Sequence, residues 1–346
     1  MKYFISVAAV IFAFFLILNP SAASGAVKSA VFDCLEVIVP SLFAFTALAI
    51  WLQKSGLYRV ALKPLTFPLS KLLRMDEELC AVFVLSNIGG YPVGVKLLSE
   101  LVNGGRLSKK DAGRMMCCCF GSGPSFVVGI AGVRVFGSTA AGLALFGACF
   151  LSSLMMAAAV RARGEIVLEK AESGYCLTSE SFISSVTGSA RVMFTVCAMI
   201  VGFAAATAAL RELGVFALFE RLFPSAEILP ALLEVTRIKE IPPTPAAMPI
   251  CAALLSFGGV CVGLQISALS GGIPLKGFMI SRIPAAVLSA LLAMPYSRVF
   301  ADIREIPALA PEASAEPFSK NALLSACVLI MSGILRIEVR RARDKK

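Results

Sequence analysis

Histidine is absent from this sequence of 346 residues, and cysteine, although present eleven times, never occurs as a CxxC pair. Without histidine, the chain cannot form a nucleophile–histidine triad, an HExxH zinc site or a histidine-ligated haem. Cys117, Cys118 and Cys119 are adjacent, and adjacent side chains diverge by about 100° on a helix, so these thiols cannot converge on one metal. The cysteines are interpreted as small apolar residues, and neither a metal site nor a cofactor is predicted.

Charge is also scarce. Only 16% of the residues are charged, 58% are hydrophobic, and the mean hydropathy is +0.84, a composition that a soluble core could not accommodate. The sequence therefore predicts an all-α polytopic membrane protein with roughly eight to ten embedded segments, half-spans included. Uncharged runs occur at residues 3–18, 37–52, 115–133, 139–160, 192–210 and 321–335.

The net charge of +10 does not indicate nucleic-acid binding, because the basic residues lie at the ends of apolar runs without interleaved aromatic residues. Residues 336–346 carry six Lys or Arg residues against Glu338 and Asp344. The positive-inside rule therefore predicts a cytosolic C-terminus, with the basic loop at residues 103–114 on the same side.

Residues 246–275 form an uncharged run of 30 residues that is interrupted by Phe257, Gly258 and Gly259. About 20 apolar residues suffice for a plain span, so this run predicts a broken membrane segment. Irregular backbone at membrane depth is tolerated only where protein buries it or where it lines a cavity. A solute path is therefore expected here.

Two parts of the chain follow the same pattern, and a single offset of 158 aligns the glycines that end their first helices, Gly56 and Gly214. We interpret residues 26–160 and 181–295 as two repeats of opposite membrane orientation, joined by a charged loop at 161–180. Residues 1–25 are expected to form a transmembrane helix that could also act as a signal anchor. Residues 296–320 are expected to form a loop before a final helix and basic tail at 321–346.

Four blocks of sequence, at residues 90–96, 122–129, 233–236 and 257–265, resemble the YlbJ-type sporulation integral membrane proteins of the nucleoside-recognition, or Gate-domain, superfamily. The resemblance covers most of residues 26–295. It implies a layout similar to that of concentrative nucleoside transporters, with two inverted repeats that each contribute a re-entrant hairpin and a broken helix. The sporulation branch implies export of dipicolinic acid from the mother cell across the outer forespore membrane. The sequence departs from the family pattern at Gly121, Arg237 and Gly263.

Glycine-rich interruptions free backbone N–H groups and expose the positive ends of half-helices, which suits an anionic solute. The predicted helix breaks are Gly89, Gly90, Gly121, Gly123, Pro124, Gly258 and Gly259. The predicted solute-binding residues are Asn87, Lys96, Ser122, Ser125, Glu234, Thr236, Arg237 and Gln265. The simpler alternatives are tight packing of small residues, interhelical hydrogen bonds, a snorkelling lysine and an interfacial end for the Glu234 segment. Asp33 and Glu36 are either a proton-coupling pair or a solvated helix start.

Three classes of function remain open. A transporter of a small anionic solute in a lipid bilayer, with dipicolinic acid as the expected solute, is favoured by the repeated breaks and the family resemblance. A nucleoside or another small solute is the alternative cargo, and a non-transporting scaffold for spore assembly is the alternative role. A membrane-embedded enzyme is the remaining class. Without histidine it would need a Cys, Ser, Lys or carboxylate pair, and no GxSxG or SxxK constellation stands out, so an enzyme is not the prediction. The sequence leaves self-association into a homo-oligomer open.

Overall fold

The computed structural model describes residues 10, 12–15, 17–169, 177–222, 228–242, 244 and 246–302. Within these residues the chain is almost entirely helical and has no β-strand, only an isolated bridge between Leu107 and Leu168. The predicted loop at 296–320 is described only to residue 302, and the predicted final helix and basic tail lie outside the described residues. The helical class predicted from the sequence is confirmed.

Four helices of the described part are long and apolar enough to cross a bilayer: Thr139–Ala162, Ser179–Glu212, Ala247–Leu269 and Lys276–Val299. The pair Pro20–Glu36 and Val39–Ser55, which is bent by 48°, would be a fifth. This count of spans cannot be compared directly with the expected eight to ten segments. The expectation included half-spans and parts of the chain outside the described ranges.

The first half of the chain contains mostly short helices. They are α2 (Pro20–Asp33), α3 (Val39–Ser55), α4 (Tyr58–Ala61), α5 (Lys63–Leu73), α6 (Glu77–Gly89), α7 (Tyr91–Asn103), α8 (Lys109–Met115), α9 (Pro124–Phe126) and α10 (Thr139–Ala162). Two π-helical segments, η1 (Cys34–Ile38) and η2 (Val127–Val135), interrupt the α-helical pattern. The bend before α3 has a local cause, since Pro40 lacks an N–H donor and its ring disturbs the preceding turn.

The second half begins with the longest helix. Its elements are α11 (Ser179–Glu212), α12 (Val215–Leu222), α13 (Leu229–Leu233), the 3₁₀ segment η4 (Val235–Glu240), α14 (Ala247–Phe257), α15 (Gly259–Leu269) and α16 (Lys276–Asp302). Ordinary capping sets several of the helix starts. Ser138 caps α10 through the amide of Ala141, and Thr178 caps α11 through the amide of Ser181.

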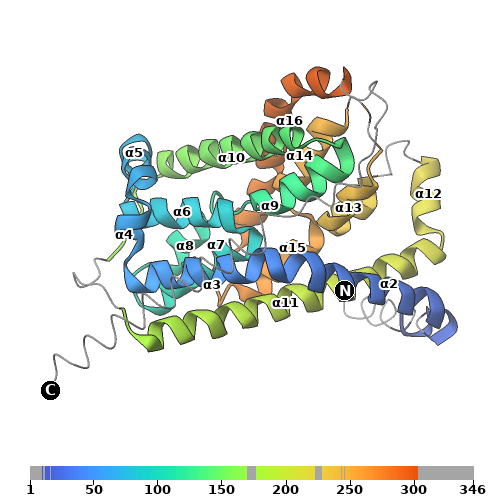
Figure 1. Cartoon of the computed structure of the whole chain (residues 1–346), viewed down its shortest axis with the longest axis horizontal. Helices are drawn as coiled ribbons and strands as arrows, with labels where there is room; N and C mark the ends of the chain where they lie inside the picture. Colours follow the sequence, from blue (N-terminus) through green and yellow to red (C-terminus); the bar gives the residue numbers. More distant parts are fainter. Residues whose placement is uncertain are drawn as a thin grey trace. The chain divides into compact units, whose positions relative to one another are not determined.

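Helices from the two halves pack against each other. In Figure 1, α3 runs beside α11, and α10 lies next to α16; both pairs are in direct contact. Helix α14 packs against α16, and η2 packs against α10. The first long helices of the two halves therefore contact each other, and so do the last ones.

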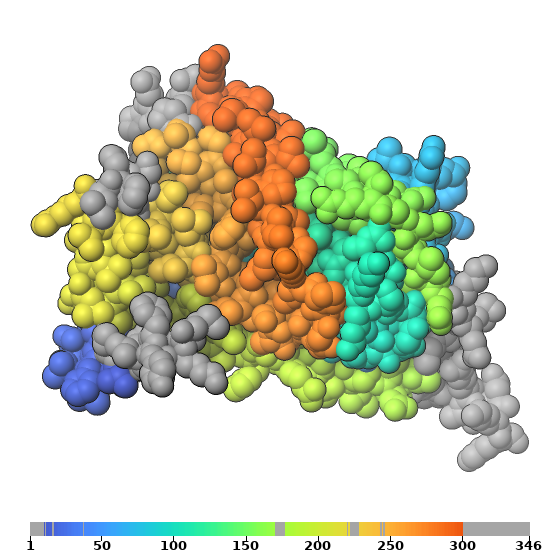
Figure 2. Space-filling model, turned by 180° about the vertical axis from the view of Figure 1, so that it is seen from behind, coloured from blue at the N-terminus to red at the C-terminus, as the bar shows by residue number. Residues whose placement is uncertain are grey.

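Helix α16 exposes large apolar side chains along one face and buries mostly small residues after Arg282 on the opposite face. Figure 2 shows this helix, in orange, running across one face of the molecule beside α10 in green. Its exposed side chains include Met279, Ile280, Ile283, Val287, Leu291 and Met294, whereas Ala285, Ser289 and Ala293 are buried. Small residues allow membrane helices to approach closely, and large apolar residues suit contact with lipid. The hydroxyl of Ser289 donates to the carbonyl of Ala252 at 2.9 Å, which fixes α16 on α14.

Candidate functional site

Helices α6 and α7 form a hairpin that turns at Gly90, where φ is +91°. Asp76 starts α6 by accepting from the amide of Glu78 at 2.8 Å, and the turn ends it because a left-handed φ suits only glycine without strain. Each helix has 13 residues, or roughly 20 Å. The hydrocarbon core is about 30 Å thick, so neither helix alone would span it.

A non-helical segment, residues 120–123, passes the tip of this hairpin. A β-carbon added at Gly121 would lie 2.6 Å from Asn87 Oδ1, and one added at Gly123 would lie 2.9 Å from the Ile88 carbonyl. Asn87 Nδ2 donates to the carbonyls of Phe83, at 2.8 Å, and Cys118, at 3.3 Å. The two glycines therefore permit backbone contact, and Asn87 joins the hairpin to the segment.

The break in the second half lies between α14 and α15. Gly258 and Gly259 have φ values of +86° and +80°, and α14 ends at Phe257 as the sequence predicted. A β-carbon on Gly259 would lie 3.1 Å from the Leu232 carbonyl, so the break touches the turn between α13 and η4. Glu234 occupies that turn and caps η4 by accepting hydrogen bonds from the amide and hydroxyl of Thr236.

The breaks of the two halves meet. The Tyr91 hydroxyl donates to the Leu255 carbonyl at 2.8 Å, and a β-carbon on Gly258 would lie 2.5 Å from the Phe120 ring. Tyr91 and Phe120 also contact each other, with ring centroids 4.8 Å apart. We call residues 90–91, 120–123 and 256–259 the break junction. All of them are buried except residue 257, which is partly buried.

Arg282 of α16 lies at the edge of the break junction and is 4% exposed. Its guanidinium donates to the carbonyls of Ser256, at 3.3 Å, and Cys117, and to the hydroxyl of Ser281. The guanidinium carbon is 4.6 Å from the Phe120 ring centroid and 4.9 Å from that of Phe278. No carboxylate of the described residues pairs with it. Inserting an arginine in a membrane helix costs about 2.5–3.5 kcal/mol on translocon scales, so an unpaired one indicates a functional role.

The predicted solute-binding residues do not all come together. Ser122 belongs to the break junction and Asn87 lies against Gly121 of it, whereas Glu234, 4% exposed, lies beside the junction with Thr236. Gln265 is buried in α15, where its side-chain nitrogen contacts Cys261 Sγ at 3.4 Å. Ser125 is exposed.

The two predicted basic ligands each have an acidic neighbour on their own element. Lys96 Nζ lies 2.6 Å from Glu100, which also contacts Lys54 at 3.3 Å, and Arg237 lies 2.7 Å from Glu240. Burial alone would raise the pKa of Glu100, but the two ammonium groups outweigh it and hold the pKa below its ordinary value. Each of these cations therefore has a carboxylate partner without a solute, although Glu100 is shared with Lys54 and Glu240 with Arg211.

Asp33 forms an ion pair with a lysine of the other half. Its carboxylate accepts from Lys239 at 3.2 Å, and Glu36 is exposed. The contact joins α2 to η4, across a separation of 206 residues. The two carboxylates, for which the sequence left open a proton-coupling pair or a solvated helix start, therefore lie in different surroundings.

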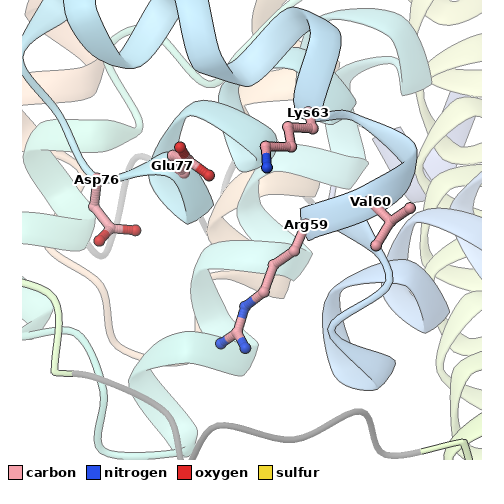
Figure 3. Close-up of a pocket in the computed structure, with 5 residues that line it drawn as sticks. All are labelled: Arg59, Val60, Lys63, Asp76 and Glu77. Carbon is pink, nitrogen blue, oxygen red and sulfur yellow. The ribbon is translucent and has the colours of Figure 1, made fainter.

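A second polar region lies away from the break junction, where α4, α5 and α6 meet. Arg59, Val60, Lys63, Asp76 and Glu77 line an open pocket of about 580 Å³, with the basic side chains facing the acidic ones across it (Figure 3). Next to it, Arg106 makes a bidentate ion pair with buried Glu78, at 2.7 Å for both contacts, and Tyr58 donates to the same carboxylate at 2.7 Å. Burial, followed by the hydrogen bond to Glu78, raises the pKa of Tyr58.

These features define an α-helical integral membrane protein with buried interruptions at the contact between its two halves. Over 152 residues the chain is 28% identical to the sporulation integral membrane protein YlbJ of Bacillus subtilis (strain 168). The aligned region covers 43% of this chain and 36% of that protein, so the similarity spans about a third of the relative's length. No family model matches the chain, and no solved structure matches it.

Proposed function

We propose that this protein transports a small anionic solute across a membrane, by moving its two halves relative to each other around the break junction. The cargo we propose is dipicolinic acid, a planar dicarboxylate, carried across the outer forespore membrane during sporulation. The choice of dipicolinic acid as the cargo rests on the resemblance of four sequence blocks to the YlbJ-type proteins.

The observation that carries the proposal is the meeting of interrupted backbone from both halves in a buried position. Residues 120–123 and the Gly258 turn lack regular helical hydrogen bonding, and lipid supplies no partner for the freed groups. In secondary transporters such interruptions form the solute site at the contact between two repeats. The hydrogen bond from Tyr91 to Leu255 is a contact that relative motion of the halves would break.

Helix pairing supports the arrangement in two repeats. We propose that residues 26–160 and 181–295 are inverted repeats and that the α6–α7 hairpin is re-entrant. A pseudo-twofold axis in the membrane plane would bring equivalent helices together, and the contacts of α3 with α11 and of α10 with α16 fit that expectation.

Uptake by purified protein in proteoliposomes tests the function. Labelled dipicolinate should accumulate, and unlabelled dipicolinate should compete with it better than nucleosides do. Ser122→Ala and Glu234→Gln should slow uptake, because one lies at the break junction and the other holds the turn beside Gly259. Glu165→Gln, in an exposed loop, is the matched control.

The outcomes separate the alternatives. Competition by nucleosides alone would assign the protein to nucleoside transport. Absence of any uptake, together with defective spore assembly in a deletion strain, would favour a scaffold. If both variants transport at the wild-type rate at normal protein levels, the solute path lies outside the break junction.

A further inference from the structure

Arg282 has unused hydrogen-bonding capacity although it is buried. A guanidinium has five N–H donors, and the carbonyls of Ser256 and Cys117 and the hydroxyl of Ser281 occupy only some of them. Arg282 Nε has no hydrogen-bond partner within the described residues. A charged donor buried in this way is costly unless a further partner arrives.

A second unsatisfied polar group lies nearby. The Ser122 hydroxyl is buried, and within the described part of the chain no group meets both the distance and the angle of a hydrogen bond to it. The Ser122 hydroxyl lies next to the Tyr91 hydroxyl, whose own proton is donated to the Leu255 carbonyl. Phe120, two residues before Ser122, contacts both the Tyr91 ring and the Arg282 guanidinium. Phe120 therefore connects the surroundings of Ser122 and Tyr91 with those of the Arg282 guanidinium.

We propose that Arg282 and Ser122 together bind a carboxylate group of the solute. This inference rests on the proposed function, because it names the residues that receive the anion. A guanidinium presents donors in a planar fork that matches a carboxylate, and a hydroxyl adds a further donor. The rings of Phe120 and Phe278 lie against the guanidinium, and the Tyr91 ring lies against Phe120. These aromatic surroundings favour a planar, aromatic carboxylate over a flexible aliphatic one.

The competing explanation is a structural one. Ser256 is the penultimate residue of α14, so its carbonyl lacks a helical amide partner, and Arg282 could act only as a cap for this carbonyl and that of Cys117. A cap of that kind has no preference for anions. The two explanations therefore differ in whether ligand charge matters.

The test is equilibrium binding of benzoate and of benzamide, its neutral analogue of similar shape, to the full-length protein in nanodiscs. Wild type should bind benzoate more tightly than benzamide. Arg282→Gln, which keeps amide donors for the two carbonyls, should weaken benzoate binding by about tenfold or more and leave benzamide binding unchanged. Ser122→Ala should weaken benzoate binding by a smaller factor. Arg298→Gln, an exposed arginine on the same helix, should change neither affinity.

Equal wild-type affinity for benzoate and benzamide overturns the proposal, and so does a folded Arg282→Gln protein with unchanged benzoate affinity. If Arg282→Gln does not fold, Ser122→Ala and the charge preference of wild type decide the matter. A protein that binds benzoate through Arg282 but accumulates no solute in proteoliposomes would refute the transport function alone. Carboxylate uptake that survives Arg282→Gln at the wild-type rate would refute this inference alone.

Discussion

The Tyr91 hydroxyl donates a hydrogen bond to the Leu255 carbonyl at 2.8 Å, across a separation of 164 residues. It joins the start of α7 in the first half to the end of α14 in the second. Both groups are buried, so the bond has no competition from water. It is therefore a direct contact between the two halves at the break junction.

Tyr91→Phe should lower the free energy of unfolding by about 1 kcal/mol, because it removes one buried hydrogen bond and leaves the Leu255 carbonyl unsatisfied. Thermal unfolding of the purified protein in detergent measures the change. Tyr296→Phe, at an exposed position of α16, is the control and should have no comparable effect. Equal stability of the two variants would show that the contact does not hold the halves together.

Gly258→Ala should destabilise the protein by about 2–4 kcal/mol, because a side chain at φ +86° is strained and its β-carbon would lie 2.5 Å from the Phe120 ring. Chemical denaturation gives the difference. Gly277→Ala is the matched control, since nothing lies within 4 Å of its added β-carbon and the position is helical. A Gly258→Ala protein as stable as the control would contradict the close contact at the break junction.

Glu78→Gln should cost on the order of 2 kcal/mol, because it removes the charge that Arg106 and Tyr58 both contact. The estimate stays below that for a fully buried pair since Arg106 is about a quarter exposed, with a side-chain exposure of 23%. A double-mutant cycle with Arg106→Gln measures the coupling. Glu77→Gln, one residue earlier and partly exposed, should be nearly neutral. A coupling energy near zero would contradict the bidentate geometry.

Glu100→Gln should destabilise the protein near neutral pH by about 1 kcal/mol, through loss of the contacts with Lys96 and Lys54. The folded-state pKa of Glu100 is lowered, so its contribution is present above the unfolded pKa of about 4.3 and is lost as the pH falls through the folded value. Melting curves between neutral and acid pH should therefore show the difference from wild type closing in acid. Glu36→Gln, exposed, is the control. A difference that does not vary with pH would contradict the ion pairs.

The end of α14 is a feature that can be predicted from the sequence. Gly258 interrupts an uncharged run, and α14 ends one residue before it, because a left-handed φ suits glycine. The charges were harder to interpret. Lys96 and Glu100 are four residues apart, a spacing that favours an ion pair on a helix, and this local partner removes Lys96 from the set of unpaired cations.

Arg282 was missed because it directly precedes the apolar stretch 283–295 and resembles a flanking charge. One signal could have revealed it. On a helix, Arg282 shares a face with the small residues Ala285, Ser289 and Ala293, and that face is buried. Its partners could not have been predicted, since the carbonyls of Cys117 and Ser256 become acceptors only once two distant helices end beside it.

The buried cysteines allow the rate at which the interior opens to be measured. Cys117, Cys118, Cys119, Cys251 and Cys261 are free and buried, and they lie on both halves close to the break junction. A thiol in that position reacts with a water-soluble maleimide only when the surrounding structure opens. After replacement of Cys176, Cys197 and Cys327 by serine, the labelling rate of the remaining thiols would measure how often water reaches the interior. Added solute should change that labelling rate if it shifts the balance between open and closed forms. The native cysteines would then report how often the protein opens during transport.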